Sequence, residues 1–287
     1  FGAMFGDVGQ GLVLFLGGLF LYKTKKMDLA GIISCAGVFS VFFGFMYGSF
    51  FGFEDVLKAI WLKPMNQMMD VPLVGRLNAV FVIAIGFGMF IILICMVFNI
   101  INSIRRGDTE KTWFDSNAVA GLVFYGSIVL TIGLFISGKK LPAAAILVIM
   151  FGVPLLLMFL KEPLTNLVEK KSKILPEQKG MFFVQSFFEL FEVLLSYLSN
   201  TLSFLRIGAF AVSHAAMMEV VLMLAGATNG GSPNWVVVVL GNIFVCAMEG
   251  LIVGIQVLRL EYYEIFSRFY AGNGREFKPF MKAAHKN

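Results

Sequence analysis

Two arginines stand in the middle of long apolar segments, where their type and spacing could support ion movement. Arg206 and Arg259 are each surrounded by Leu, Ile, Val and Phe. A charged side chain at the centre of a membrane helix costs at least about 2.5 kcal/mol on insertion scales. A guanidinium stays protonated at any accessible pH, so it could attract a carboxylate, lower the proton affinity of that carboxylate and repel passing cations.

Other polar residues accompany the arginines on one face of each segment. Between 180 and 226 they recur at steps of three, four or seven: Gln185, Glu189, Glu192, Ser196, Asn200, Ser203, Arg206, Ser213 and His214. Between 234 and 270 they are Asn242, Glu249, Gln256, Arg259 and Tyr263. A polar stripe on a membrane helix faces protein or water, so two such helices could line an aqueous path together.

The depths of the acidic residues suggest two separate paths. If the two helices are antiparallel with their arginines level, Glu249 lies near position 216, beside His214 and close to Glu219. Glu192 precedes Arg206 by about 21 Å of helical rise. This layout is expected of two offset half-channels separated by a fixed positive charge.

A structural interpretation of these residues stays open. Glu219 and Glu249 could simply neutralise the arginines, and His214 could be a helix-packing residue. Against neutralisation, the nearest acidic residues of the stripe, Glu192, Glu219 and Glu249, lie about 15–21 Å along the helices from the arginines. We therefore expect the stripe to lack an adjacent counter-charge, which a partner carboxylate could supply.

The composition shows what kind of fold must position these residues. Of 287 residues, 58% are hydrophobic and only 14% are charged, whereas soluble domains carry about 25% charged residues. A purely soluble fold is excluded. Seven apolar helical segments are visible, at 8–22, 29–53, 77–104, 117–137, 141–160, 180–226 and 234–270.

The prediction is an all-α, polytopic membrane helix bundle. At about 20 residues per span, the apolar content could supply about six to eight transmembrane helices. Segment 180–226 would be about 70 Å long as a helix, too long for an upright span, so it must tilt steeply or begin along the interface. We expect two long, tilted, polar-striped helices in 176–287, forming the half-channels, and scaffold helices in 1–175.

The basic residues predict the orientation. Sixteen Lys and Arg fall in connections on one face, Arg268 and the C-terminal tail among them, and five on the other. By the positive-inside rule the first face, with the C-terminus, is cytoplasmic. The net charge of +5 is mainly this orientation signal, so no nucleic-acid partner is expected.

Further motifs predict structure rather than chemistry. Cys35, Cys95 and Cys246 lie in apolar runs and are interpreted as small buried hydrophobes, without a disulfide, metal or cofactor site. The motif GDVGQG at 6–11 lacks the preceding strand of a nucleotide-binding loop. It predicts a tight turn between membrane helices, with Asp7 capping the next helix.

Four blocks of sequence resemble one known family. MFGDVGQG at 4–11, GVFSVFFGFMYGSFF at 37–51, SYLSNTLSFLRIGAFAVSHA at 196–215 and EGLIVGIQVLRLEYYEIFSRFYAGNGREFKPF at 249–280 resemble the membrane domain of subunit a, or subunit I, of V/A-type rotary ATPases. In that family a cytoplasmic stalk-binding domain precedes eight membrane helices. The resemblance implies that this sequence starts inside a longer protein.

The resemblance assigns roles to particular positions. Its essential arginine corresponds to Arg206, its second arginine to Arg259, and its half-channel acidic positions to Glu192 and Glu249. Its histidine after the first arginine is retained as His214. Where eukaryotic members have a histidine before the second arginine this chain has Gln256, and Ser196 occupies a polar channel position; the coupling ion thus stays open between proton and sodium.

The resemblance implies a membrane stator that carries ions to and from a rotor ring of carboxylate-bearing proteolipid subunits, with no covalent chemistry in this chain. Peripheral stalk subunits would bind through the preceding domain, and the setting would be the lipid of a prokaryotic plasma membrane rather than a vacuolar membrane. Competing classes are a self-contained secondary transporter or ion channel, and a passive scaffold. The residues expected to take part in ion translocation are Arg206, Arg259, Glu192, Glu249, His214, Glu219, Ser196, Asn200 and Gln256.

Overall fold

Helices dominate the computed structural model, which describes residues 1–53, 56–65, 68–71, 75–139, 142–168, 179–227, 233–270 and 272. The helices are α1 (Val8–Lys25), α2 (Asp28–Tyr47), α3 (Ala79–Arg106), α4 (Thr109–Trp113), α5 (Val119–Ile136), α6 (Ala144–Phe159), α7 (Lys161–Val168), α8 (Lys179–Ser203), α9 (Leu205–Leu224), α10 (Trp235–Leu260), the π-helix η2 (Glu261–Phe266) and α11 (Ser267–Phe269). The predicted all-α bundle is confirmed, and each predicted apolar segment is largely helical.

A short antiparallel ribbon was not predicted. Strand β1 (Met68–Val71) pairs with β2 (Gly75–Asn78), placing Met68 opposite Asn78. The predicted boundary at 175, the basic residues between 169 and 178, and the C-terminal tail beyond 272 lie outside the described residues.

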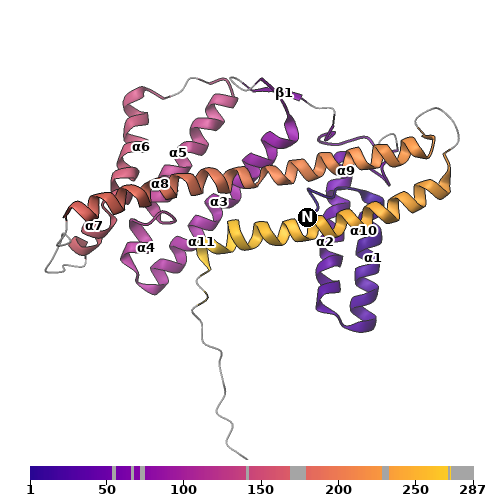
Figure 1. Ribbon diagram of the computed structural model, residues 1–287, viewed down its shortest axis with the longest axis horizontal. Coiled ribbons are helices and arrows are strands. Elements are labelled where there is room, and N and C mark those ends of the chain that lie inside the picture. Colours follow the sequence, from indigo (N-terminus) through magenta and orange to yellow (C-terminus); the bar gives the residue numbers. More distant parts are fainter. Residues whose placement is uncertain are drawn as a thin grey trace, which may run out of the picture.

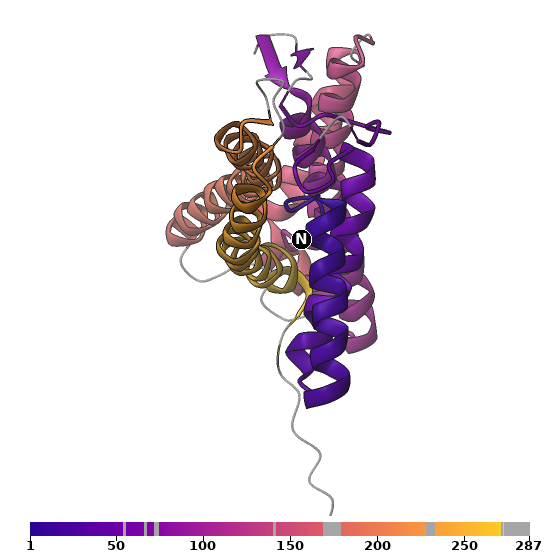
Figure 2. The same ribbon diagram turned by 90° about the vertical axis from the view of Figure 1, so that its right-hand side faces the viewer.

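The helices form two layers that cross (Figure 1). Helices α1, α2, α5 and α6 run up and down in this view, while α8 and α9 continue one another across them and α10 returns antiparallel below α9. Figure 2 shows the long pair on one side and the upright helices on the other. The steep tilt expected of the two long segments is thus present relative to the other helices.

Five helical stretches of the described chain have the length and composition of membrane spans, and the chain is an integral membrane protein. They are Asp28–Tyr47, Ala79–Arg106, Val119–Ile136, Gly180–Leu224 and Trp235–Phe269. A sixth arises if α6 and α7, which meet at a 73° bend, form one broken span. Helix α1 is not among them; its last turn carries Lys23 and Lys25.

The first long segment runs as one helical stretch over Gly180–Leu224, with a local 3₁₀-type turn at Phe204 between α8 and α9. Phe204 is 1% exposed, and Ile207 donates its backbone N–H to the Phe204 carbonyl rather than continuing the α-helical pattern. The Phe204 ring lies against Gly88 of α3, where an added Cβ would sit 2.2 Å from the ring. A glycine on α3 therefore makes room for the side chain at this turn.

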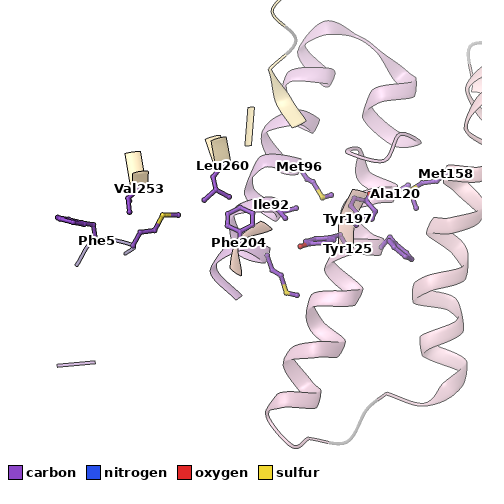
Figure 3. Close-up of a cluster of buried hydrophobic side chains, with 13 residues drawn as sticks. Phe5, Ile92, Met96, Ala120, Tyr125, Met158, Tyr197, Phe204, Val253 and Leu260 are labelled. Atoms are coloured by element: carbon purple, nitrogen blue, oxygen red, sulfur yellow. The ribbon is translucent and has the colours of Figure 1, made fainter. Parts of the chain in front are cut away.

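The largest hydrophobic core lies between the two layers. It joins Ile92 and Met96 of α3, Tyr125 of α5, and Val253 and Leu260 of α10. Figure 3 shows these side chains with those of Tyr197 and Phe204, beside the upright helices. This core sets the depth and rotation of α8–α10, and with them the position of the polar stripe.

The N-terminal turn is organised by Asp7, which caps α1 as predicted. Its Oδ1 accepts from the Gln10 backbone N–H at 2.9 Å. The same carboxylate also accepts from the Ser49 hydroxyl at 2.6 Å and from the backbone N–H groups of Phe51 and Gly52. Asp7, which is fully buried, thus ties the start of α1 to the end of the α1–α2 hairpin.

Candidate functional site

The two intramembrane arginines lie near one another but in different environments. Arg206 is half-buried in the first turn of α9, and its Nη2 donates to the Ser203 hydroxyl at 2.9 Å. Its Nη1 is buried without a hydrogen-bond partner among the described residues. Arg259 is exposed near the end of α10. The charged groups acting on Arg206 are Glu264, which is attractive, and Arg259, which is repulsive.

A carboxylate outside the predicted stripe, that of Glu264, lies one hydroxyl group away from Arg206. The Ser203 hydroxyl that accepts from Arg206 also hydrogen-bonds to Glu264 Oε1. Glu264 belongs to the π-helix η2 and is 5% exposed. Sequence analysis missed it because it lies 61 residues from Ser203 and was not counted in the polar stripe.

A polar cavity lies before Arg206 along the same helical segment. It has a volume of about 380 Å³ and opens to the surface. The predicted residues Glu192, Ser196 and Asn200 line it, and Asn200 Nδ2 donates to Ser196 Oγ at 3.2 Å. The structure therefore brings these three candidates together around one opening.

Residues of other helices complete this cavity and were not predicted. They are Asp115, Ser116 and Asn117 before α5, Lys161 of α7, and Ser267 and Arg268 of α11. Lys161 Nζ lies 2.8 Å from Glu189 Oε2, and this ion pair joins two residues of the cavity lining. A charge pattern in a single segment could not reveal these neighbours, because the connection before α5, helix α7 and helix α11 supply them.

Arg268, which was counted among the basic connections of one face, is instead a buried arginine in the short helix α11. It is 7% exposed; its Nη1 donates to Asn117 Oδ1 at 2.9 Å, and its guanidinium carbon lies 5.9 Å from the centre of the Tyr197 ring. Its Nε and Nη2 have no hydrogen-bond partner among the described residues. The spacing of four residues from Glu264 places both on one helical face, a signal that the sequence contained.

His214 and Glu249 form a buried pair on the other side of Arg206. His214 Nδ1 lies 2.6 Å from Glu249 Oε2, and Glu249 is 1% exposed. This contact agrees with the predicted depths of the two antiparallel helices. Glu219, expected nearby, is exposed on α9, and Gln256 is half-buried one turn before Arg259.

A second, small cavity reaches the histidine. Its volume is about 20 Å³, enough for one water molecule, and Ser49, Gly52, Pro64, His214 and Met218 are among its lining residues. His214 Nε2 and Glu249 Oε1 are buried without hydrogen-bond partners among the described residues. Such unpaired polar atoms are costly, so a water or an ion at this place would satisfy them.

The α1–α2 hairpin meets α10 close to this pair. Gln10 Nε2 donates to Asn242 Oδ1 at 2.8 Å, and Asn242 Nδ2 donates to the Val238 carbonyl at 2.9 Å. The Phe5 ring lies 4.7 Å from the His214 ring, centre to centre. The N-terminal turn thus closes one side of the His214–Glu249 pair.

The geometry separates two kinds of environment along one helical segment. An open cavity with carboxylates and hydroxyls lies on one side of Arg206, and a buried histidine–carboxylate pair lies on the other. Carboxylate, imidazole and hydroxyl groups bind and release small cations or protons. Arg206 lies between these two groups of residues along the helical segment.

The chain is similar in sequence to proteins of one known family. The model of the V-type ATPase 116 kDa subunit family matches residues 161–282. The chain is similar to the A-type ATP synthase subunit I of Aeropyrum pernix, 27% identical over 97% of the chain and 45% of that protein. It is also 41% identical to the subunit I of Saccharolobus solfataricus over 32% of the chain and 14% of that protein.

A human relative is similar over a comparable stretch. The V-type proton ATPase 116 kDa subunit a 3 of Homo sapiens is 35% identical over 32% of the chain and 13% of that protein. The chain spans less than half the length of the curated relatives it matches.

Proposed function

Because the chain belongs to the V-type ATPase 116 kDa subunit family, we propose that it forms the membrane stator of a rotary V/A-type ATPase. It conducts protons or sodium ions through two offset half-channels, to and from carboxylates on a rotor ring supplied by other chains. One observation carries the proposal: the polar cavity and the buried His214–Glu249 pair lie on opposite sides of Arg206.

The open cavity is the inner half-channel. Glu192, Ser196 and Asn200 offer successive oxygen atoms along α8 toward Arg206, and consecutive members of this set lie about one helical turn, 5.4 Å, apart. Water in a cavity of about 380 Å³ can connect these groups. The basic connections predict that this side is cytoplasmic.

The His214–Glu249 pair belongs to the outer half-channel. The pair has one open nitrogen and one open oxygen, and the small cavity beside Ser49 adjoins the histidine. A proton can be exchanged between imidazole and carboxylate at hydrogen-bond distance. Gln256 is half-buried between this pair and Arg259. Its uncharged amide can hydrogen-bond to water along the path but cannot itself carry a proton.

The arginines separate the two half-channels. A ring carboxylate that meets Arg206 is stabilised in its charged form, because an opposite charge favours ionisation. The carboxylate therefore releases its proton or sodium ion to one path before it turns to the other. Arg259, exposed on α10, widens the positive surface that the ring meets.

The family relationship suggests the remaining partners. We expect peripheral stalk subunits to bind a part of the protein that precedes this sequence, and we expect a prokaryotic plasma membrane because the matches include several archaeal subunits I. A self-contained transporter or channel is the alternative. Cross-links between this chain and a carboxylate-bearing ring subunit in native membranes would exclude that alternative.

The decisive experiment replaces Arg206 in the complete ATPase complex. Arg206→Ala and Arg206→Lys should abolish ATP-driven ion uptake into vesicles, because alanine removes the charge and lysine can deprotonate in an apolar site. Co-purification of the other subunits should persist. The matched control is Arg105→Ala, an exposed arginine at the end of α3, which should keep normal uptake. Full uptake by an assembled Arg206→Ala complex would refute the stator function.

A further inference from the structure

A buried chain of hydrogen bonds connects Arg206 to the π-helix of the opposite long segment. Arg206 Nη2 donates to Ser203 Oγ at 2.9 Å, and Ser203 Oγ is hydrogen-bonded to Glu264 Oε1. A guanidinium has only donors, so the serine oxygen must accept from Arg206. The single serine proton is then directed to Glu264, which fits an ionised carboxylate.

Both ends of this chain retain an open polar atom. Glu264 Oε2 and Arg206 Nη1 are buried without hydrogen-bond partners among the described residues. Nη2 of Arg206 is thus held by Ser203, while Nη1 is buried without a hydrogen-bond partner among the described residues. Charge-assisted bonds of this kind are stronger than neutral ones, so the chain restrains the rotamer of Arg206.

The fold places Glu264 at this position through an unusual turn. Residues Glu261–Phe266 form a π-helix directly after α10, and Ser203 is the last residue of α8 before the turn at Phe204. Single π-turns inside α-helices are rare and are frequent at functional sites. Here two local departures from α-helical geometry meet at one hydrogen-bonded contact.

The surrounding charges are unbalanced. Arg206, Arg259 and Arg268 act on this region, and Glu264 is the carboxylate that acts on both Arg206 and Arg268. Removing one member of a buried charge network leaves its partners uncompensated. Glu264 therefore offsets part of the positive charge whenever no ring carboxylate faces Arg206.

We propose that Glu264 is a positioning residue for Arg206, acting through the Ser203 hydroxyl. Through this contact it holds the orientation of the Arg206 guanidinium, and it moderates the positive potential that an arriving ring carboxylate meets. The inference rests on the proposed stator function. In this role Glu264 neither binds the transported ion nor touches the ring.

The test compares charge and contact variants in the complete complex. Glu264→Gln removes the charge but keeps an oxygen that can accept from Ser203. With a more positive potential at Arg206, a ring carboxylate needs a lower pH to become protonated. The pH profile of ATP-driven uptake should therefore move to lower pH by about half a unit or more. The matched control is Glu261→Gln, on the same π-helix, which should leave the profile in place.

The contact is tested separately at Ser203. Ser203→Ala and Glu264→Ala should each lower the uptake rate by about tenfold, since misplaced groups commonly cost this much or more. The double variant should be no slower than the slower single variant. Ser203→Thr, which keeps a hydroxyl, should restore most of the rate.

Three outcomes would overturn the inference. One is a uniform loss of rate at all pH values without a shift in Glu264→Gln. Another is a double variant, Ser203→Ala with Glu264→Ala, whose uptake rate falls by the product of the two single-variant factors. The last is complete loss of uptake in an assembled Glu264→Gln complex, which would make Glu264 an ion carrier. Arg206→Ala, measured alongside, separates these results from failure of the stator function itself.

Discussion

Buried polar side chains in this protein are mostly paired, and the exceptions cluster around the proposed path. Asp7 has four hydrogen bonds from the groups around it, which is a structural arrangement. Arg206, His214 and Glu249, by contrast, each keep one buried atom without a partner among the described residues. Unpaired buried atoms in a native protein indicate either function or a bound water or ion.

The His214–Glu249 pair gives a prediction at this scale. Glu249→Gln should slow ATP-driven uptake by about tenfold, because it removes the group that can take up a proton or cation from the outer path. The vesicles should not become leaky, since Arg206 remains. The measurement is the uptake rate together with the passive leak of the same vesicles. Asp28→Asn, an equal charge change at the exposed start of α2, serves as control, and an unchanged rate in Glu249→Gln would make Glu249 a structural partner only.

Among the elements, the turn at Phe204 and the π-helix η2 matter most. Ser203 and Glu264, which hydrogen-bond to one another, lie at these two irregular turns. The turn at Phe204 depends on α3, where Gly88 leaves space for the Phe204 ring. Helix α3 therefore packs against the turn that precedes Arg206.

Replacing this glycine tests the support that α3 provides. In Gly88→Ala the new Cβ would lie 2.2–2.5 Å from atoms of Phe204, so helix α3 or the turn at Phe204 must shift. We expect the purified complex to melt at a lower temperature and to lose most of its uptake, as overpacking costs about 1–3 kcal/mol. Gly86→Ala is the matched control, because a Cβ there meets nothing within 4 Å. Equal melting temperatures for the two variants would contradict the packing argument.

The molecule as a whole places its N-terminal turn against the last long helix. Gln10 and Asn242 are 232 residues apart in sequence and form a buried hydrogen bond. Together with Phe5 against His214, this contact joins the upright hairpin to the crossing layer seen in Figure 2. The outer part of the proposed path therefore depends on both layers.

A double-mutant cycle measures this connection between layers. Gln10→Ala and Asn242→Ala should each destabilise the complex by about 1–3 kcal/mol, because each leaves a buried amide unpaired. The double variant should lose clearly less stability than the sum of the losses in the two single variants. Thermal melting of the purified complex provides the readout, with Ile243→Ala, an exposed neighbour on α10, as control. Strictly additive losses would show that the two amides do not interact.

The amino-acid sequence by itself determined the membrane helices, the polar stripe and the cap at Asp7. These features depend on local composition and on a spacing of three or four residues, so they can be predicted without knowledge of tertiary contacts. It also predicted that His214 and Glu249 would meet, because two antiparallel helices with level arginines fix the depth of every other residue.

Only the tertiary structure decided the partners of the arginines. The Ser203–Glu264 contact lies at the turn at Phe204 and at the π-helix, and no sequence pattern predicted either irregularity. Arg268 was counted among the basic connections, yet it is buried here and contacts Tyr197 and Asn117. The physical reason is common to these cases: the rotation of one helix against another is set by core packing across the whole molecule, and periodicity within one segment does not specify it.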